Sequence, residues 1–247
     1  MQIMTTFNNE QYEMALADWA NCCANYQVIQ QLIPTNFVFE LTPDQIDWLK
    51  KTNDNKNFCT EIGVYSDKLV LILCPLDNKG LKIPVTEHPY SFLAELTSDL
   101  TLMEKQEYTV VKNAVLSKEL CNIDHNSNMY LPVSNVPIMD QDKALASIES
   151  WRTEGMTWFY MECSEFKGSR IFKRFLVPAE DLTPMKENLS GIVCSFGLKF
   201  SDIYQRTLVT LIFISQYKEL LENNGNSIQT ISNTYDWSQP CPPICNI

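Results

Sequence analysis

The same series of landmarks occurs twice along this chain, which limits the folds that it can adopt. Each half presents a helix with a tryptophan, an aromatic strand, a proline-led acidic helix start, a strand with a glycine, and a strongly apolar strand. In the first half these are Trp19, Phe37–Phe39, Pro43–Ile46, Ile62–Tyr65 and Leu69–Leu73, and in the second half Trp151, Phe175–Val177, Pro178–Leu182, Phe196–Phe200 and Leu208–Ile212. Equivalent landmarks are 132 residues apart for the tryptophans and 139 for the leucines. This spacing predicts an internal duplication.

A competing alignment pairs Trp48 with Trp151 and Pro75 with Pro178. If this alignment is the correct one, the likeness of the halves is no greater than that between any two α+β segments, and no duplication is implied. In either case alternating apolar strands and amphipathic helices predict an α+β fold. We expect two similar lobes with antiparallel strand hairpins and packed helices. A groove between such lobes would be the first place to look for a site.

Local patterns predict the individual elements. The lobes are assigned to residues 1–137 and 138–247, with the boundary in a loop at 122–141. In the first half we further expect a helix over 8–30, a hairpin of Phe58–Tyr65 with Lys68–Cys74, and a third strand at Leu81–Val85. Two more helices are expected to start at His88 and at the capping box Thr101–Glu104. In the second half we expect a helix over Asp142–Thr153 and a strand over Thr157–Cys163.

Charge and composition exclude several classes of protein. The 247 residues are 45% hydrophobic and carry a formal net charge of −11, which would repel the phosphates of nucleic acid. The apolar runs are far shorter than the roughly 20 residues of a membrane span. The N-terminus lacks the pattern of a signal peptide, so we expect a soluble cytoplasmic protein with reduced cysteines. The first half of the chain carries most of the net negative charge, and all four arginines lie in the second half.

Catalytic signatures are absent from the sequence, and no catalytic residue is assigned. Only His88 and His125 could serve a histidine-dependent nucleophile. An enzyme with a site between the lobes is the alternative, with His125 and Asp124, or Glu180 and Asp181, as candidates. Acidic residues such as the latter pair also favour a helix N-terminus for purely structural reasons.

Four residues form the candidate metal site: Cys121, His125, Cys241 and Cys245. Two thiolates in the tail, with a third thiolate and an imidazole, would suit tetrahedral zinc and make a zinc-stapled structural module. Without zinc, Cys241 and Cys245 could pair as a disulfide in an exported protein. No other cofactor is predicted.

The tail also carries a candidate partner-binding set: Trp237, Pro240, Pro242 and Pro243. Tryptophan is a frequent anchor in interfaces, and prolines reduce the entropy lost on binding. The alternative is that this tail docks on the protein's own body. The basic and aromatic segment Phe166–Phe175 could contact single-stranded nucleic acid, but lysine and arginine also protect exposed strand edges.

Residues 140–247 resemble a group of uncharacterised bacterial proteins. The resemblance is carried by Trp151, the step Phe175–Leu182, the pair Phe196–Gly197, and the tail Tyr235–Cys245, which reads Tyr-Asp-x-Ser-x-Pro-Cys-Pro-Pro-x-Cys. It implies no activity.

These observations together favour a non-enzymatic binding protein. An acidic surface fits a basic protein partner, as in an immunity-type protein that neutralises a toxin by charge complementarity.

Overall fold

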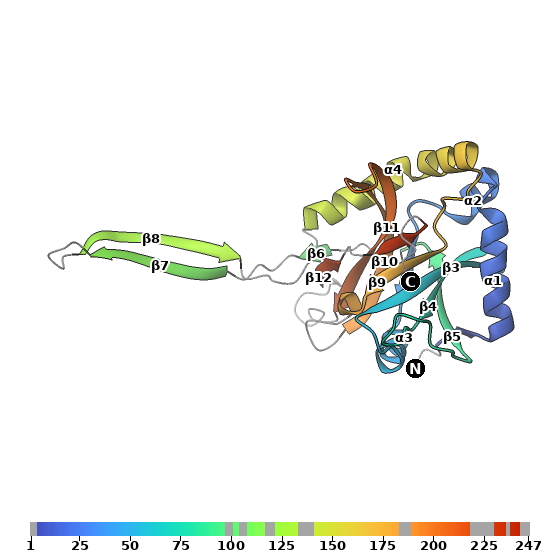
Figure 1. Ribbon diagram of the computed structural model, residues 1–247, viewed down its shortest axis with the longest axis horizontal. Helices are drawn as coiled ribbons and strands as arrows, with labels where there is room; N and C mark the ends of the chain where they lie inside the picture. The colour runs from blue at the N-terminus through green and yellow to red at the C-terminus, as the bar shows by residue number, and fades with distance from the viewer. Residues whose placement is uncertain are drawn as a thin grey trace, which may run out of the picture.

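The computed structural model describes residues 4–96, 101–103, 108–116, 122–132, 141–182, 189–217, 230–235 and 238–242 (Figure 1). The first part of the chain forms β1 (Thr6–Phe7), α1 (Asn9–Cys22), α2 (Tyr26–Leu32), β2 (Val38–Leu41), α3 (Pro43–Thr52), β3 (Asn57–Tyr65), β4 (Lys68–Cys74) and β5 (His88–Ala94). The middle forms β6 (Thr101–Met103), β7 (Tyr108–Leu116) and β8 (Asn122–Pro132). The last part forms α4 (Gln141–Phe166), β9 (Arg174–Pro178), the 3-10 turn η1 (Ala179–Leu182), β10 (Leu189–Ser201), β11 (Arg206–Tyr217), β12 (Thr230–Tyr235) and β13 (Gln239–Cys241).

Side-chain caps fix where the first helices begin. Asn8 and Gln11 form a capping box that starts α1, with the Gln11 N–H donating to Asn8 Oδ1 over 2.9 Å. Thr42 and Gln45 do the same for α3. The single helix expected over 8–30 is instead two helices, because the Asn25 side chain accepts hydrogen bonds from the next backbone N–H groups and starts α2 anew.

The strands form one large, mostly antiparallel sheet in the order β13-β9-β3-β4-β5-β2-β10-β11-β12-β6, with β1 added on β5. The β3–β4 hairpin is confirmed as predicted. Its two turn residues, Ser66 and Asp67, both have positive φ, which matches the strand twist in two-residue turns. The short pairing of β12 with β6 is parallel.

In this sheet the first-half strands β3, β4, β5 and β2 lie between two groups of second-half strands. The α+β class is therefore confirmed, but the two predicted lobes are not. The first-half strand β2 pairs with β10, and the second-half strand β9 pairs with β3. One hydrophobic cluster includes Trp19 and Phe58 together with Trp151 and Phe213, so side chains of both halves pack together. The assigned boundary at 137/138 lies outside the described residues.

The far edge of the sheet turns back toward β11, so that the sheet nearly closes. Ser238, which directly precedes β13, accepts a hydrogen bond from Leu211 N over 2.6 Å and is 3.1 Å from Leu211 O. Because β13 also pairs with β9, it links β9 near one end of the strand order with β11 near the other.

Several expected elements differ from the structure. The helices expected at His88 and at Thr101–Glu104 correspond to strands β5 and β6, and the loop expected over 122–141 contains β8. The strand expected over Thr157–Cys163 belongs to α4. The buried positions of this helix, residues 151, 155, 159 and 162, recur at helical spacing. The short segment 157–163 contains too few of these positions to show that spacing, and its aromatic residues favour a strand.

Strands β7 and β8 pair only with each other and form a separate two-stranded ribbon, drawn extending away from the large sheet (Figure 1). Among the described residues, no helix has the length and apolar character needed to cross a membrane.

Candidate functional site

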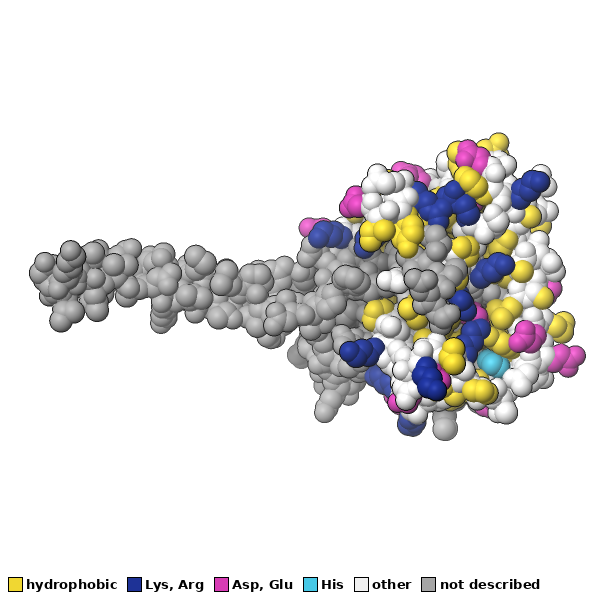
Figure 2. Space-filling model, in the orientation of Figure 1, with side chains coloured by type: hydrophobic (Ala, Val, Ile, Leu, Met, Phe, Trp, Pro, Cys, Tyr) yellow, Lys and Arg dark blue, Asp and Glu magenta, His cyan; other side chains and the backbone are white. Residues whose placement is uncertain are grey.

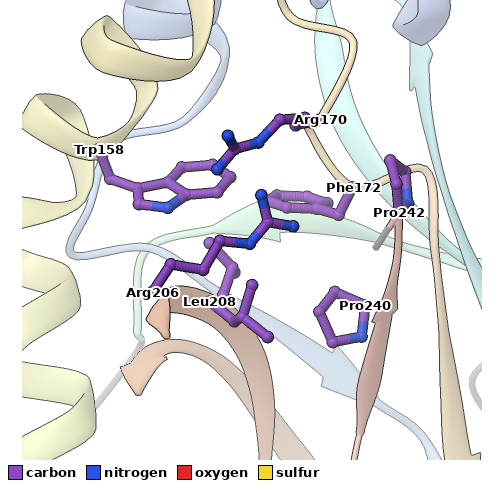
Figure 3. Close-up of a pocket in the computed structure, with 8 residues that line it drawn as sticks. Trp158, Arg170, Phe172, Arg206, Leu208, Pro240 and Pro242 are labelled. Atoms are coloured by element: carbon purple, nitrogen blue, oxygen red, sulfur yellow. The ribbon is translucent and has the colours of Figure 1, made fainter. Parts of the chain in front are cut away.

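A narrow crevice lies where α4, the loop after it, β11 and β13 meet (Figure 3). Its lining combines two arginines with aromatic, aliphatic and proline side chains: Trp158, Arg170, Phe172, Arg206, Leu208, Val209, Pro240 and Pro242. These residues are up to 84 positions apart in the sequence, counted from Trp158 to Pro242. Only the near-closure of the sheet brings them together.

Two arginines lie near one buried carboxylate at this crevice, and one of them is paired with it. Arg170 Nη2 donates to Glu162 Oε1 over 3.0 Å, and its guanidinium lies 3.7 Å from the centre of the Phe166 ring. The Arg206 side chain makes no hydrogen bond or ion pair with the other described residues. Figure 3 shows the two guanidinium groups turned toward each other. The local charge is therefore positive by one guanidinium.

Burial is the largest cause of the pKa shifts of Arg206 and Glu162. Burial lowers the pKa of Arg206, Arg170 lowers it further, and Glu162 acts in the opposite direction. The pKa of Glu162 is raised, because burial outweighs the two arginines. Glu162 is only 5% exposed. The site thus holds like charges in a partly desolvated place, where an added anion would be favourable.

The Glu162–Arg170 pair leaves hydrogen-bonding capacity unused. A bidentate pair would use both carboxylate oxygens. Here Glu162 Oε2 and Arg170 Nε are both buried and have no hydrogen-bond partner within the described part of the chain.

The aromatic wall of the crevice is held in place. The Trp158 indole N–H donates to the backbone oxygen of Thr207 over 3.1 Å. Its ring lies nearly parallel to Phe172, at 21° and 6.2 Å between centroids. Phe172 is 1% exposed, so it backs the partly exposed Trp158 ring from inside the core.

The tail supplies the opposite wall. Pro240 lies in β13, and Pro242 follows it after a cis peptide bond. Both were predicted as partner-binding residues, and the structure places both at the crevice. Trp237 and Pro243, the other two of that set, lie outside the described residues.

An exposed apolar tip adjoins the crevice. The turn between β10 and β11 presents Phe200, Ile203 and Tyr204, and Ile203 is 87% exposed. Phe200 pairs with Thr207, whose backbone oxygen holds Trp158. Tyr204 is close enough to Arg206 to influence its pKa. We call these three residues the hairpin tip.

Basic side chains gather across the centre of the face in Figure 2, and acidic ones lie nearer its margin. The net charge of −11 is therefore not spread evenly over this face.

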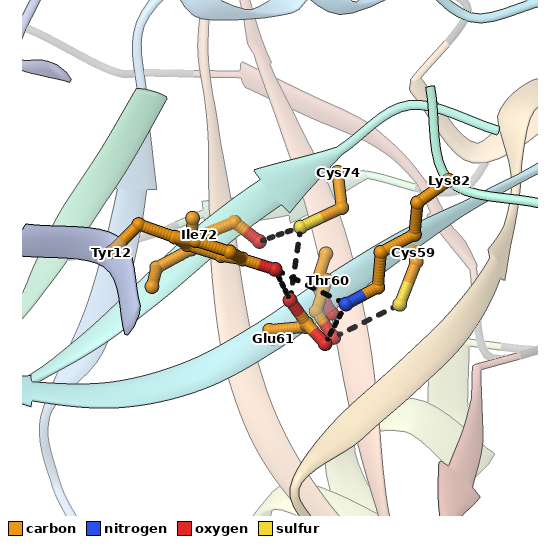
Figure 4. A network of polar contacts seen from close by, with 7 residues as sticks. All are labelled: Tyr12, Cys59, Thr60, Glu61, Ile72, Cys74 and Lys82. Atoms are coloured by element: carbon orange, nitrogen blue, oxygen red, sulfur yellow. Dashed lines mark hydrogen bonds and ion pairs between the residues drawn. The ribbon is translucent and has the colours of Figure 1, made fainter. Parts of the chain in front are cut away.

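A second polar cluster surrounds Glu61, which is 5% exposed in the middle of β3 (Figure 4). Tyr12 of α1 donates a short hydrogen bond to Glu61 Oε2. Lys82 Nζ lies 2.5 Å from Glu61 Oε1 and 3.1 Å from the Tyr12 hydroxyl. The thiol of Cys74 also donates to Glu61 Oε2, over 3.4 Å.

The pKa shifts in this cluster keep its phenol and its two thiols protonated. Burial raises the pKa of Tyr12, raises that of Cys74 well above its usual value, and raises that of Cys59 to about 12. Burial opposes charge on Lys82, yet Glu61 raises the Lys82 pKa on balance. A nucleophilic thiol needs a lowered pKa. The cluster therefore has the properties of a structural network that compensates one buried carboxylate.

His88 stacks on Tyr12 with parallel rings whose centroids are 4.0 Å apart, and its Nε2 is 2.9 Å from Asn9 Oδ1. Burial lowers the His88 pKa, and Nδ1 is buried without a partner among the described residues. His88 thus lies in β5 as a neutral packing residue.

The predicted metal site lies mostly beyond what the structure describes. Cys121 and Cys245 are outside the described residues, and only the backbone of His125 and Asp124, in β8, is described. Cys241 is disulfide-bonded, whereas zinc would need it as a free thiolate. Within the described ranges no group of three His, Cys, Asp or Glu side chains is arranged to hold a metal. The zinc site stays a prediction.

The enzyme candidates Glu180 and Asp181 fall in η1, where only the backbone is described. Sequence reasoning missed Trp158, Glu162 and Arg206. The one available signal was that all four arginines lie in the second half of an acidic chain.

Comparison with protein-family models, curated proteins and solved structures gave no match. The resemblance of residues 140–247 to uncharacterised bacterial proteins therefore stays a prediction.

Proposed function

We propose that this protein is a non-enzymatic binding protein that contacts a protein partner through the hairpin tip and the adjoining crevice. The observation that carries this proposal is that three exposed apolar side chains lie on the hairpin whose Thr207 holds Trp158 and whose Tyr204 acts electrostatically on Arg206. Tryptophan, tyrosine and arginine are the residues that most often dominate binding energy in protein interfaces.

The narrowness of the crevice favours contact with a larger partner over binding of a complete small molecule. Pockets for small ligands usually enclose about 300–1,000 Å³. Half of the side chains that line the crevice are buried and it encloses far less free volume than that, so a partner would contact its mouth rather than enter it. The enzyme alternative placed its active site in a groove between lobes, and the pairing of strands from both halves within one sheet gives it no support.

The identity of the partner is a separate part of the proposal. The net charge of −11 favours a basic protein, including the toxin-like partner of an immunity-type protein. We also propose a cytoplasmic location, which the unoxidised thiols of Cys59 and Cys74, among the described residues, support. The disulfide at Cys241 favours an oxidising compartment instead.

We further propose that the chain arose by duplication. The element order α1, β2, α3, β3, β4, β5 resembles α4, β9, η1, β10, β11, β12. In this alignment β2 is equivalent to β9, and β3 is equivalent to β10. If each strand of the pair β2–β10 is replaced by its equivalent, the pair becomes β9–β3, and the sheet contains both pairs. Ala15, four residues before Trp19, approaches Gly63, and Ser147, four residues before Trp151, approaches Gly197. This recurring contact supports the alignment that pairs Trp19 with Trp151.

The binding surface is tested by substituting Ile203→Asp and, as a matched control, Met14→Asp. Met14 is also exposed, at 57%, but lies on α1. We expect a partner retained from native lysate by the wild type and by M14D to be retained at least tenfold less by I203D, because a charge replaces an apolar contact (tenfold corresponds to about 1.4 kcal/mol). Equal retention by all three proteins would remove the hairpin tip from the proposal. Sedimentation of the purified protein shows whether the partner is a second copy of the chain.

A further inference from the structure

We propose that the mouth of the crevice is a carboxylate-binding site, in which the partly exposed Arg206 pairs with an acidic side chain whose neighbouring apolar residue lies against the partly exposed Trp158. This inference deepens the proposed function, since it names the chemistry of the group that a partner inserts. It rests on the proposed function only for the partner; the site itself can be tested with peptides.

The charge balance of the crevice calls for one anion. Arg170 and Arg206 face a single buried carboxylate, Glu162, and Glu165 is the other acidic group near it but is exposed. Arg170 is already paired with Glu162, and Arg206 has no such partner among the described residues. A single negative charge would neutralise the set, and charge-assisted hydrogen bonds are roughly twice as strong as neutral ones.

The shape and polarity of the lining favour a carboxylate joined to an apolar group. A guanidinium offers a planar fork that matches a carboxylate in bidentate geometry. Around it stand the partly exposed Trp158 and the buried Phe172 and Pro240, which are apolar and add no further described charge. A phosphate dianion would exceed the available charge by one and would approach the buried Glu162.

Substitution of Glu162 should change carboxylate binding in the direction opposite to substitution of Arg206. It holds Arg170 and at the same time repels any incoming anion. Glu162→Gln keeps the acceptor oxygen for Arg170 but removes one negative charge. This variant should therefore bind a carboxylate more tightly, whereas Arg206→Gln should bind it less tightly. Damage to the fold would weaken binding in both variants.

The experiment uses the full chain, labelled with ¹⁵N, and follows the Trp158 indole and arginine Nε signals during titration. The probes are acetyl-Phe-Glu-amide, its neutral isostere acetyl-Phe-Gln-amide, and inorganic phosphate. Trp158→Phe assigns the indole signal. Arg152→Gln is the control, because it removes the same charge from an exposed position elsewhere on α4.

The acidic peptide should shift the Trp158 signal. It should bind at least about tenfold more tightly than the neutral peptide, as expected for a charge-assisted hydrogen bond. R206Q should lose that preference, Arg206→Lys should lose part of it, E162Q should strengthen it several-fold, and R152Q should leave it unchanged. Equal binding of both peptides, equal losses in R206Q and R152Q, or tighter binding of phosphate than of the acidic peptide would overturn the proposal.

The two proposals fail separately. If the peptides show no preference but I203D still loses its partner, the carboxylate site is wrong and the binding surface stands. If the peptide preference is present but I203D retains its partner, the site stands and the function assigned to the hairpin tip is wrong.

Discussion

At the scale of single residues, Lys82 determines whether the buried carboxylate of Glu61 can be tolerated. Replacing Lys82 by methionine leaves Glu61 charged and without its ion pair. Breaking a buried pair costs about 3–5 kcal/mol, and because Lys82 is 39% exposed we expect about 2–3 kcal/mol. Urea unfolding of Lys82→Met measures this loss. Lys79→Met, in the same loop but exposed, should change the free energy of unfolding by less than about 0.5 kcal/mol.

The double variant Glu61→Gln with Lys82→Met separates the pair from its surroundings. Most of the stability should return, because the uncompensated charge is gone. A double variant as unstable as Lys82→Met alone would mean that Lys82 acts through packing of its aliphatic chain instead.

His88 should make stability depend on pH. Its folded pKa lies below the ordinary value of 6.5, because burial disfavours the imidazolium and Lys82 adds to this, although Glu61 and Glu13 oppose it. The contribution is therefore present above pH 6.5 and is lost as the pH falls through the folded pKa. His88→Phe keeps the stack on Tyr12 without a proton to bind. The difference in unfolding free energy between wild type and H88F should shrink or reverse between pH 7.5 and pH 5; a constant difference would contradict the assignment.

At the scale of elements, Gly168 fixes how α4 ends against α1. Its φ is +71°, and a Cβ there would lie 2.0 Å from the backbone oxygen of Cys23. Gly168→Ala should therefore destabilise by about 3 kcal/mol or more, since left-handed strain and overpacking act together. It should also weaken peptide binding at the crevice, because Arg170 follows two residues later.

The neighbouring residue gives a control of opposite sign. Lys167 is exposed and also has positive φ, at +53°. Lys167→Gly relieves that strain and should leave thermal stability unchanged or raise it slightly. If both variants melt at the same temperature as the wild type, the contact of Gly168 with Cys23 has no energetic weight.

Two helix–strand contacts should respond to the same substitution in unequal degree. A Cβ on Gly63 would meet Ala15 Cβ at 3.0 Å and its backbone at 3.2 Å, so α1 would have to move. A Cβ on Gly197 would meet Ile212 Cδ1 at 2.7 Å, which a rotamer change relieves. Both alanine variants should be destabilised within the roughly 1–3 kcal/mol typical of overpacking. Gly63→Ala should lose more in denaturant unfolding, and the reverse order would contradict this account.

At the scale of the whole molecule, local chemistry was predictable and long-range pairing was not. The capping residue Thr42 and the turn at Ser66 and Asp67 act on their neighbours, so the sequence alone locates them. The interleaving of β2 and β9 depends on strands from the other half of the chain, which no local pattern reports. The crevice is the extreme case. Pro240 and Pro242 were recognisable in the tail, but Trp158 and Arg206 gain their roles only after the sheet nearly closes.

The shared core makes a prediction about cooperativity. Because β2 and β9 each pair across the two halves, neither half can complete its sheet alone, and Trp19 and Trp151 belong to one core. The chain should therefore unfold in a single transition. Phe58 is fully buried in the first half, and Phe58→Ala should cost about 3–5 kcal/mol. This loss should shift the transition reported by the second-half residue Trp158 as much as the far-ultraviolet transition. A Trp158 midpoint that stays in place would mean that the halves unfold independently, as two lobes would.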